Sequence, residues 1–167
     1  VTIFSRDSKI TDSINNHHFN PKLKYVVFND NVSAQNNLEL LSDMHYIFIA
    51  LPSQNIREVL SAINLQNKDQ EIIIASKGIE IKSGLLLSQV ITETVLTKNI
   101  SILSGPCFSD EVAQNLPTAV TFASKSKKSF NTISTLIKNK NFRLYYSDDL
   151  IGCQVGGALK NIYAIAS

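Results

Sequence analysis

Short apolar runs that alternate with helical segments restrict the fold of this chain more than any other feature. Two of these runs are HYIFIAL at 45–51 and EIIIA at 71–75, and both are apolar on their two faces. A helical pattern follows each of them, at 55–63 and at 84–96. Strands of this kind are typical of a parallel sheet that helices cover on both sides. The sequence therefore predicts an α/β fold with a mostly parallel sheet.

The same alternation continues along the rest of the chain. The segment 15–37 is rich in asparagine and should form a loop, with short strands at most near 25–28 and 32–34. We find no internal repeat and no second core, and 167 residues suffice for one full domain. Further strands are expected at 1–4, 100–103, 118–123 and 142–146, and further helices at 7–14, 36–43, 110–115, 126–138 and from 149 onward.

Composition argues against several functional classes. The chain has 16 basic and 14 acidic residues, a net charge of +2 that is too small and too scattered to indicate nucleic-acid binding. No apolar run approaches the roughly 18 residues of a membrane span. Cys107 and Cys153 have no metal-type partner at close spacing. We therefore expect no metal site, and reduced thiols in a cytoplasmic protein.

Residues that follow the strands mark the expected ligand site, because open α/β sheets bind ligands outside the carboxyl ends of their strands. Arg6 follows the first run, where a basic group of a dinucleotide-binding fold tolerates a cofactor 2′-phosphate. Lys77 precedes Gly78 at another strand end and suits a phosphate or carbonyl oxygen as a mobile point charge. Gly105 begins a turn whose amides suit an anion. Solvated side chains and an ordinary turn are the alternatives.

Lys160 is the one charged side chain of the last helical segment after Asp149. Gly156 and Gly157 lie one helical turn before it, and two helical glycines cost about 1 kcal/mol each relative to alanine. We therefore expect a backbone or a ligand to approach this side closely. A stripe of residues on another side is expected to face the core, namely Ile151, Val155, Leu159, Ile162 and Ala166. Asp148 or Asp149 should cap the helix.

No GxGxxG motif occurs in the chain. In a dinucleotide-binding fold this phosphate-binding turn joins the first strand to the first helix. We therefore expect that strand and its turn to lie upstream of Val1, in a longer protein.

Several long motifs together resemble a known family. They are VTIFSRD, ALPSQNIREVL, ASKGIE, LSGPCFSDEVAQNLPTAV and FRLYYSDDLIGCQVGGALKNIYAIAS. In order and spacing they are similar to the NAD(P)-dependent glycerol-3-phosphate dehydrogenases of the bacterial type, over nearly the whole chain. The resemblance implies a Rossmann-like NAD(P)-binding domain at 1–146 and the first helix of a helical substrate-binding domain at 147–167. Cys107 and Ser109 depart from that family, which usually has serine and alanine there.

The resemblance also implies site residues and a reaction. The reaction is hydride exchange between NAD(P)H and dihydroxyacetone phosphate or sn-glycerol 3-phosphate, for phospholipid synthesis, with Lys160 as the catalytic proton carrier. The implied cofactor contacts are Arg6, Pro52, Lys77 and Ser109, and the implied substrate contacts are Lys77, Gly105, Cys107, Lys160 and Asn161.

Several questions stay open at the level of the sequence. It does not separate NAD from NADP, and it leaves the oligomeric state open, with a homodimer as one option. The alternatives are a related lysine-dependent dehydrogenase that acts on another small carbonyl compound, or a non-catalytic binding fragment.

Overall fold

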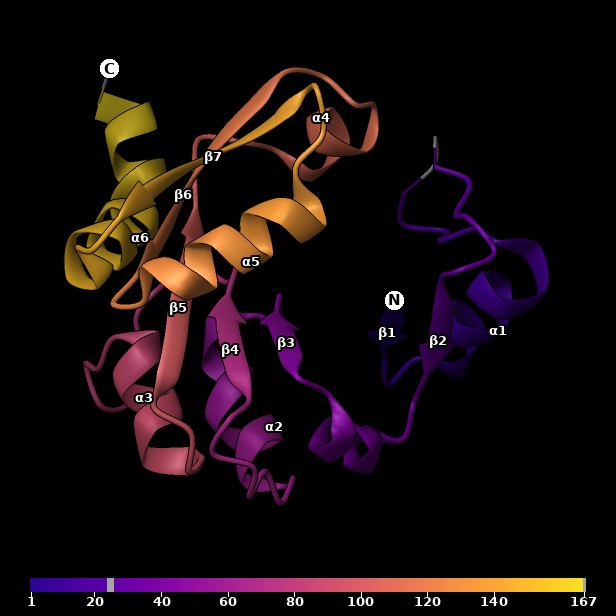
Figure 1. Ribbon diagram of the computed structural model, residues 1–167, viewed down its shortest axis with the longest axis horizontal. Coiled ribbons are helices and arrows are strands. Elements are labelled where there is room, and N and C mark those ends of the chain that lie inside the picture. The colour runs from indigo at the N-terminus through magenta and orange to yellow at the C-terminus, as the bar shows by residue number, and fades with distance from the viewer. Residues whose placement is uncertain (24–25, 167) are drawn as a thin grey trace.

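Strands and helices alternate from one end of the chain to the other (Figure 1). The computed structural model describes residues 1–23 and 26–166, without the side chains at 161, 163 and 164. The strands are β1 (Thr2–Phe4), β2 (Ser33–Gln35), β3 (Tyr46–Ile49), β4 (Glu71–Ile74), β5 (Asn99–Ser104), β6 (Thr118–Ser124) and β7 (Phe142–Ser147). The helices are α1 (Ser8–His17), η1 (Leu38–Asp43), η2 (Ser53–Asn55), α2 (Ile56–Ser61), α3 (Leu87–Thr94), α4 (Ser109–Ala113), α5 (Lys127–Ile137) and α6 (Leu150–Ala166).

The main sheet has five strands in the order β3-β4-β5-β6-β7. Neighbouring strands are parallel except for the antiparallel pair of β5 and β6. Figure 1 shows α5 over one face of this sheet and α6 near the end formed by β6 and β7. The predicted α/β architecture with a mostly parallel sheet is therefore confirmed.

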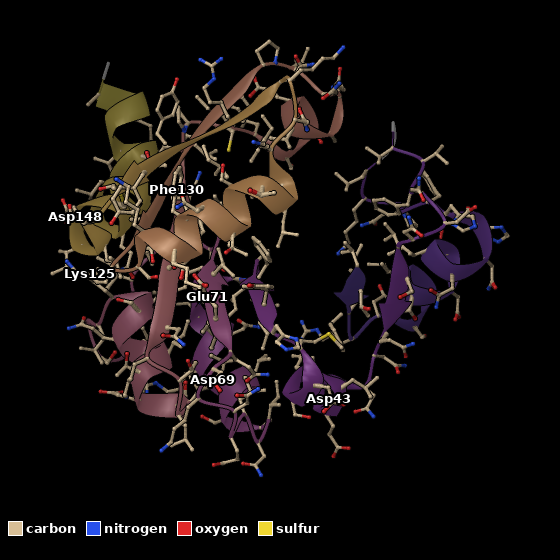
Figure 2. The ribbon with its side chains drawn as sticks, in the orientation of Figure 1. Asp43, Asp69, Glu71, Lys125, Phe130 and Asp148 are labelled. Atoms are coloured by element: carbon tan, nitrogen blue, oxygen red, sulfur yellow. The ribbon has the colours of Figure 1, made fainter. Side chains whose placement is uncertain are left out.

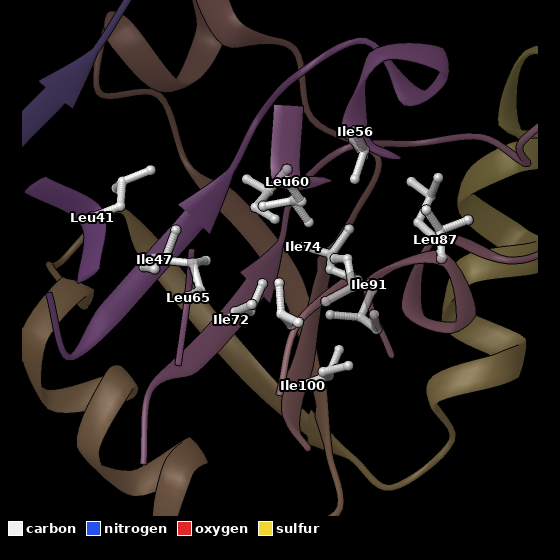
Figure 3. Packing of buried hydrophobic residues seen from close by; sticks show 14 of the residues in the cluster. Leu41, Ile47, Ile56, Leu60, Leu65, Ile72, Ile74, Leu87, Ile91 and Ile100 are labelled. Carbon is white, nitrogen blue, oxygen red and sulfur yellow. The ribbon is translucent and has the colours of Figure 1, made fainter. Parts of the chain in front are cut away.

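The interior strand β4, between β3 and β5, explains why helices cover both faces. Its isoleucines alternate between two cores and are fully buried. Ile72 and Ile74 pack with α2 and α3, which contribute Leu60 and Ile91 (Figure 3). Ile73 points to the other face, in the core that includes residues of β6 and α5. Burial of each isoleucine contributes about 1.5–3 kcal/mol, so a two-sided apolar strand is stable only when both faces are covered.

A smaller unit forms around β1, α1 and β2, to one side of the main sheet (Figure 1). β1 and β2 are parallel, and α1 packs Ile10 and Ile14 against Ala34. The Asn15 side chain accepts a hydrogen bond from the Ala34 amide (2.8 Å) and donates one to its carbonyl (3.0 Å). This amide therefore satisfies both backbone groups of Ala34 on β2.

Two sequence expectations about elements need comment. The strand expected at 25–28 includes a residue that is not described, and Val27 forms only an isolated bridge with Phe19. Among the described strands, β1 pairs only with β2 and β3 only with β4. The additional strand that we expect upstream of Val1 stays a prediction.

None of the helices in the described ranges is both long and apolar enough to cross a membrane.

Candidate functional site

The tips of β3 and β4 are held together just beyond their last residues. The Ser76 hydroxyl donates to the Leu51 carbonyl oxygen at 2.6 Å. Gly78 has a φ of +135°, a backbone conformation that residues other than glycine rarely adopt. A Cβ at this position would lie 2.7 Å from the Ser53 Oγ. Glycine thus allows the turn after β4 to pass close to the segment after β3.

Lys77 reaches from the tip of β4 to the tip of β5. Its Nζ donates to the Gly105 carbonyl oxygen at 2.9 Å. Gly105 is also confined, because a Cβ there would lie 2.8 Å from Val120 Cγ1 and 2.9 Å from the Ala119 carbonyl oxygen. The sequence prediction that Lys77 and Gly105 lie at neighbouring strand ends is consistent with this contact.

Helix α6, which carries Lys160, is capped at its start and attached to α3. The Asp149 side chain accepts from the Gly152 amide at 2.8 Å and so caps the helix, as expected. The Gln154 side chain accepts from the Ser88 amide and donates to the Ser88 hydroxyl, both at 2.9 Å. These bonds fix α6 to the start of α3.

The two glycines of α6 differ in their surroundings. A Cβ on Gly157 would lie 2.9 Å from Ser104 Oγ and 3.7 Å from Lys77 Cγ, so the expected close approach occurs here. A Cβ on Gly156 would meet no atom within 4 Å among the described residues, so it does not occur there. Gly157 therefore lets α6 lie directly against the tip of β5.

The apolar stripe expected to face the core does not do so. Ile151 and Ile162 are 65% and 61% exposed. The helix contacts β5 and β6, and its packed side carries Leu150, Cys153 and the buried Gln154. The periodicity predicted a helix correctly but the wrong side of it, because the packed side combines only two apolar residues with a hydrogen-bonded glutamine and a glycine.

Lys160 lies half-buried on this helix, beside the segment that joins β5 to α4. Its Nζ donates to the Cys107 carbonyl oxygen at 3.4 Å and lies 4.1 Å from the centre of the Phe108 ring. A lysine ammonium over an aromatic face gains about 0.5–1 kcal/mol at an exposed site. Two amines thus converge on one short segment, since Lys77 contacts Gly105 and Lys160 contacts Cys107 and Phe108.

The convergence changes the acidity of Lys77. Partial burial lowers its pKa from the ordinary value, and the positive charge of Lys160 lowers it further. Cys107 opposes this shift. Burial and the charge of Lys160 disfavour the ammonium form, so Lys77 at the tip of β4 releases its proton more readily than a free lysine.

The remaining predicted site residues are less closely joined. Pro52 is exposed and precedes η2, whose Ser53 contacts Gly78. Ser109 is exposed and begins α4, directly after Phe108. Arg6 is exposed beyond β1, and its side chain takes part in no hydrogen bond or ion pair among the described residues. The side chain of Asn161 lies outside the described part of the chain.

Phe108 is the contact residue that our reading of the sequence missed. It is 62% exposed and occupies the N-cap position of α4 without a side-chain hydrogen bond to that helix. A large aromatic residue directly after the strand-end turn SGPC was the available signal.

A hollow of about 550 Å³ lies elsewhere, between α3, the start of β5 and the start of α5. Glu71 and Lys125, labelled in Figure 2, are among its lining residues. The buried Glu71 carboxylate accepts from the Ser101 hydroxyl at 2.7 Å, and the Lys125 amine donates to the Asp148 carbonyl oxygen at 2.9 Å. Because its charged groups already have partners within the protein, we place the candidate site at the strand tips instead.

Known proteins share both the sequence and the fold. The family described as NAD-dependent glycerol-3-phosphate dehydrogenase N-terminus matches residues 1–130. The glycerol-3-phosphate dehydrogenase (NAD(P)+) of Zymomonas mobilis is 41% identical over 167 residues, 99% of this chain and 48% of that protein. The enzyme of the same name from Neorickettsia sennetsu is 38% identical, over 99% of this chain and 50% of its own length.

Solved structures agree with these relatives. The glycerol-3-phosphate dehydrogenase of Coxiella burnetii superposes with a TM-score of 0.88 at 30% identity, over 99% of this chain and 52% of that one. The yeast glycerol-3-phosphate dehydrogenase gives a TM-score of 0.83 at 25% identity and the same coverage. The chain spans about half the length of the curated relatives it matches. With well over half of its residues matched, and with the fold of those structures, the chain belongs to the NAD-dependent glycerol-3-phosphate dehydrogenase family and corresponds to its N-terminal part.

Proposed function

We propose that the protein carrying this chain exchanges a hydride between NAD(P)H and dihydroxyacetone phosphate, giving sn-glycerol 3-phosphate. The observation that carries the proposal is the convergence of two amines on the segment after β5. Lys77 Nζ lies 2.9 Å from the Gly105 carbonyl oxygen, and Lys160 Nζ lies 3.4 Å from that of Cys107. Two positive groups at the carboxyl ends of a parallel sheet suit a small phosphorylated substrate.

We assign the strand tips to the dinucleotide cofactor. Gly78 adopts a positive φ, and a Cβ there would collide with Ser53, so the backbone turns sharply at this edge. We assign Pro52, Lys77 and Ser109 to the cofactor, and Arg6 to its adenosine end. A nicotinamide held by these residues would supply the hydride in one direction and accept it in the other. Titration of the complete protein with NADH and with NADPH measures the two affinities and so decides which cofactor is preferred.

We assign the handling of one proton to the protein itself. Lys160 as an ammonium donates a proton to the substrate carbonyl oxygen during reduction, and as an amine it accepts one in the reverse direction. Gly105 and Cys107 offer the segment that lines the substrate, and we assign Asn161 to the same substrate. Lys77 contributes a neighbouring positive charge, which draws the anionic substrate toward Lys160.

We further propose a boundary between residues 146 and 147. Residues 1–146 then form the NAD(P)-binding domain, and α6 opens a helical substrate-binding domain. The support is the contrast within α6, which packs Leu150 and Gln154 against the sheet and α3 but leaves Ile151, Ile162 and Ile165 exposed. We also propose that the protein is a cytoplasmic enzyme and that its product, glycerol 3-phosphate, is used for phospholipid synthesis. A homodimer is one option for its oligomeric state. The two free cysteines suit such a reducing compartment.

Substitution of Lys160 tests the proposal. We expect Lys160→Ala in the complete protein to lower kcat for dihydroxyacetone phosphate by a factor of about 10²–10⁴, the usual contribution of a proton-transfer group. The affinity for NADH and NADPH, measured by isothermal titration, should change little. Lys128→Ala removes an exposed lysine of α5 and serves as the control. Near-normal turnover of Lys160→Ala would remove Lys160 from the mechanism, and an unsubstituted protein inert toward dihydroxyacetone phosphate would refute the proposed reaction.

A further inference from the structure

The turn that carries Lys77 is fastened by a buried carboxylate. Glu80 is only 5% exposed. The Arg57 Nε donates to its two carboxylate oxygens at 2.8 and 3.1 Å, and Arg57 Nη2 donates to Oε2 at 2.9 Å. The Ser83 hydroxyl donates to the same oxygen. This forked contact fixes the direction of the carboxylate as well as its position.

Arg57 ties the turn to two helices. It belongs to α2, and its Nη2 also lies 2.8 Å from Oε2 of Glu93 on α3. The two acidic partners differ, because Glu93 is 53% exposed and lies on a helix, whereas Glu80 belongs to the turn itself. The pair with Glu80 therefore anchors the turn, and the pair with Glu93 joins two helices that already pack together.

A second side chain holds the backbone on both sides of Glu80. The Gln54 Nε2 donates to the Ile79 carbonyl oxygen at 2.8 Å, and its Oε1 accepts from the Ile81 amide at 2.9 Å. Together with the tight contact of Gly78 and Ser53, these bonds restrain the chain immediately after Lys77.

The charges of this anchor persist at neutral pH. The hydrogen bonds from Arg57, followed by the one from Ser83, lower the pKa of Glu80 to about 2. The hydrogen bonds that Arg57 donates to Glu80 and then to Glu93 raise the pKa of Arg57 above its ordinary value. Buried ion pairs can often be replaced by apolar residues of similar volume without loss of stability, so we take the fixed geometry of the forked contact as its main contribution.

Placement of the Lys77 backbone decides where its amine lies. A lysine side chain is long and flexible, and its tip reaches the Gly105 carbonyl oxygen only from a suitable Cα position. We propose that Glu80, through Arg57, is a positioning residue that fixes the turn at 77–81 and so holds the Lys77 amine opposite Lys160. The inference rests on the proposed function, since Lys77 matters for turnover only if the strand tips are the active site.

Two variants of the complete protein separate positioning from simple stabilisation. Glu80→Gln removes the negative charge of the turn. Glu93→Gln makes the same carboxylate-to-amide change at the other acidic partner of Arg57. We expect Glu80→Gln to raise the KM for dihydroxyacetone phosphate about tenfold, the usual effect of losing one hydrogen bond to a charged group, with a smaller change in kcat. Glu93→Gln should leave both constants nearly unchanged. Assays are run well below the Tm of each variant.

Hydrogen–deuterium exchange gives a readout that does not depend on turnover. We expect the amides of residues 77–81 to exchange faster in Glu80→Gln but not in Glu93→Gln. Gln54→Ala, at an exposed position, loosens the same turn without removing a buried group, so it replaces Glu80→Gln if that variant does not fold. Unchanged exchange, or loosened exchange with an unchanged KM, would overturn the inference. If the unsubstituted protein does not reduce dihydroxyacetone phosphate, the proposed function fails, and exchange alone then decides whether Glu80 holds the turn.

Discussion

Gly156 and Gly157 provide a matched pair of substitutions, because they are adjacent on α6 and differ in what lies in front of them. An alanine Cβ at Gly157 would lie 2.9 Å from Ser104 Oγ and 3.7 Å from Lys77 Cγ. At Gly156 the same atom would meet nothing within 4 Å among the described residues. Both changes replace a helical glycine by the best helix former, so only the packing differs.

The expected magnitudes follow from these distances. Gly156→Ala should raise the free energy of unfolding by about 1 kcal/mol, the whole difference in helix propensity. Gly157→Ala gains the same amount, but the Ser104 hydroxyl must move, and inserting a methyl into a packed contact costs about 1–3 kcal/mol. The cost should be near the lower end because a serine hydroxyl can rotate. Gly157→Ala should therefore be about 1–2 kcal/mol less stable than Gly156→Ala.

Activity should separate the two variants more clearly than stability. The new methyl group at Gly157 would also lie beside Lys77 Cγ, whose amine donates to the Gly105 carbonyl oxygen, so even a small adjustment of α6 changes the position of Lys160 relative to Lys77. We expect Gly157→Ala to lose about tenfold or more in kcat/KM, since small displacements of a catalytic group are costly, and Gly156→Ala to keep nearly all of it.

Urea unfolding followed by circular dichroism measures the stabilities, and steady-state reduction of dihydroxyacetone phosphate measures kcat/KM. Equal stabilisation by the two alanines, together with equal activity, would refute the close packing of α6 against the tip of β5. Loss of activity in Gly156→Ala alone would show that the important contact lies on another side of the helix.

Two further predictions concern the groups around the lysines. Because hydrogen bonds hold the pKa of Glu80 at about 2 against an ordinary 4.5, its pair with Arg57 contributes stability that is fully present above pH 4.5 and lost as the pH falls toward 2. Urea midpoints measured across this window should fall less steeply in Glu80→Gln than in the unsubstituted protein, and parallel curves would contradict the assignment. Phe108→Leu removes the ring beneath the Lys160 amine, an interaction of about 0.5–1 kcal/mol, and should lower kcat/KM by about two- to fivefold, whereas Phe108→Tyr keeps the ring and the activity. Equal effects of Leu and Tyr would show that the ring face does not matter.

The main sheet was predictable because its strands are apolar on both faces. The run EIIIA required burial on both sides, and Ile72, Ile73 and Ile74 are fully buried between helices. The strand tips followed from the same prediction, since carboxyl ends of parallel strands lie at one edge of a sheet. Lys77 and Gly105 were therefore both expected at the edge of the sheet where a ligand binds.

The side of α6 that faces the domain could not be predicted by counting apolar residues. Periodicity selected the stripe that begins with Ile151, but the contact with α3 is made by the amide of Gln154. A buried glutamine is costly unless each of its groups has a partner, and the partner, Ser88, is remote in sequence. Its role depends on tertiary geometry that no local pattern contains.

The same reasoning explains why Lys77 and Lys160 were recognisable while the residues that hold them were not. A lysine among glycines stands out, whereas Arg57 and Glu80 resemble ordinary solvated charges until the turn brings them together. The backbone is held in place at both lysines. The anchored turn after β4 holds it at Lys77, and the packing of Gly157 against Ser104 holds the helix that carries Lys160. Long side chains with fixed backbones keep their amines within a small region while their tips can still move. Such an arrangement suits the proton transfer that we propose for Lys160, and it depends on Gly157 and on the ion pair of Arg57 with Glu80.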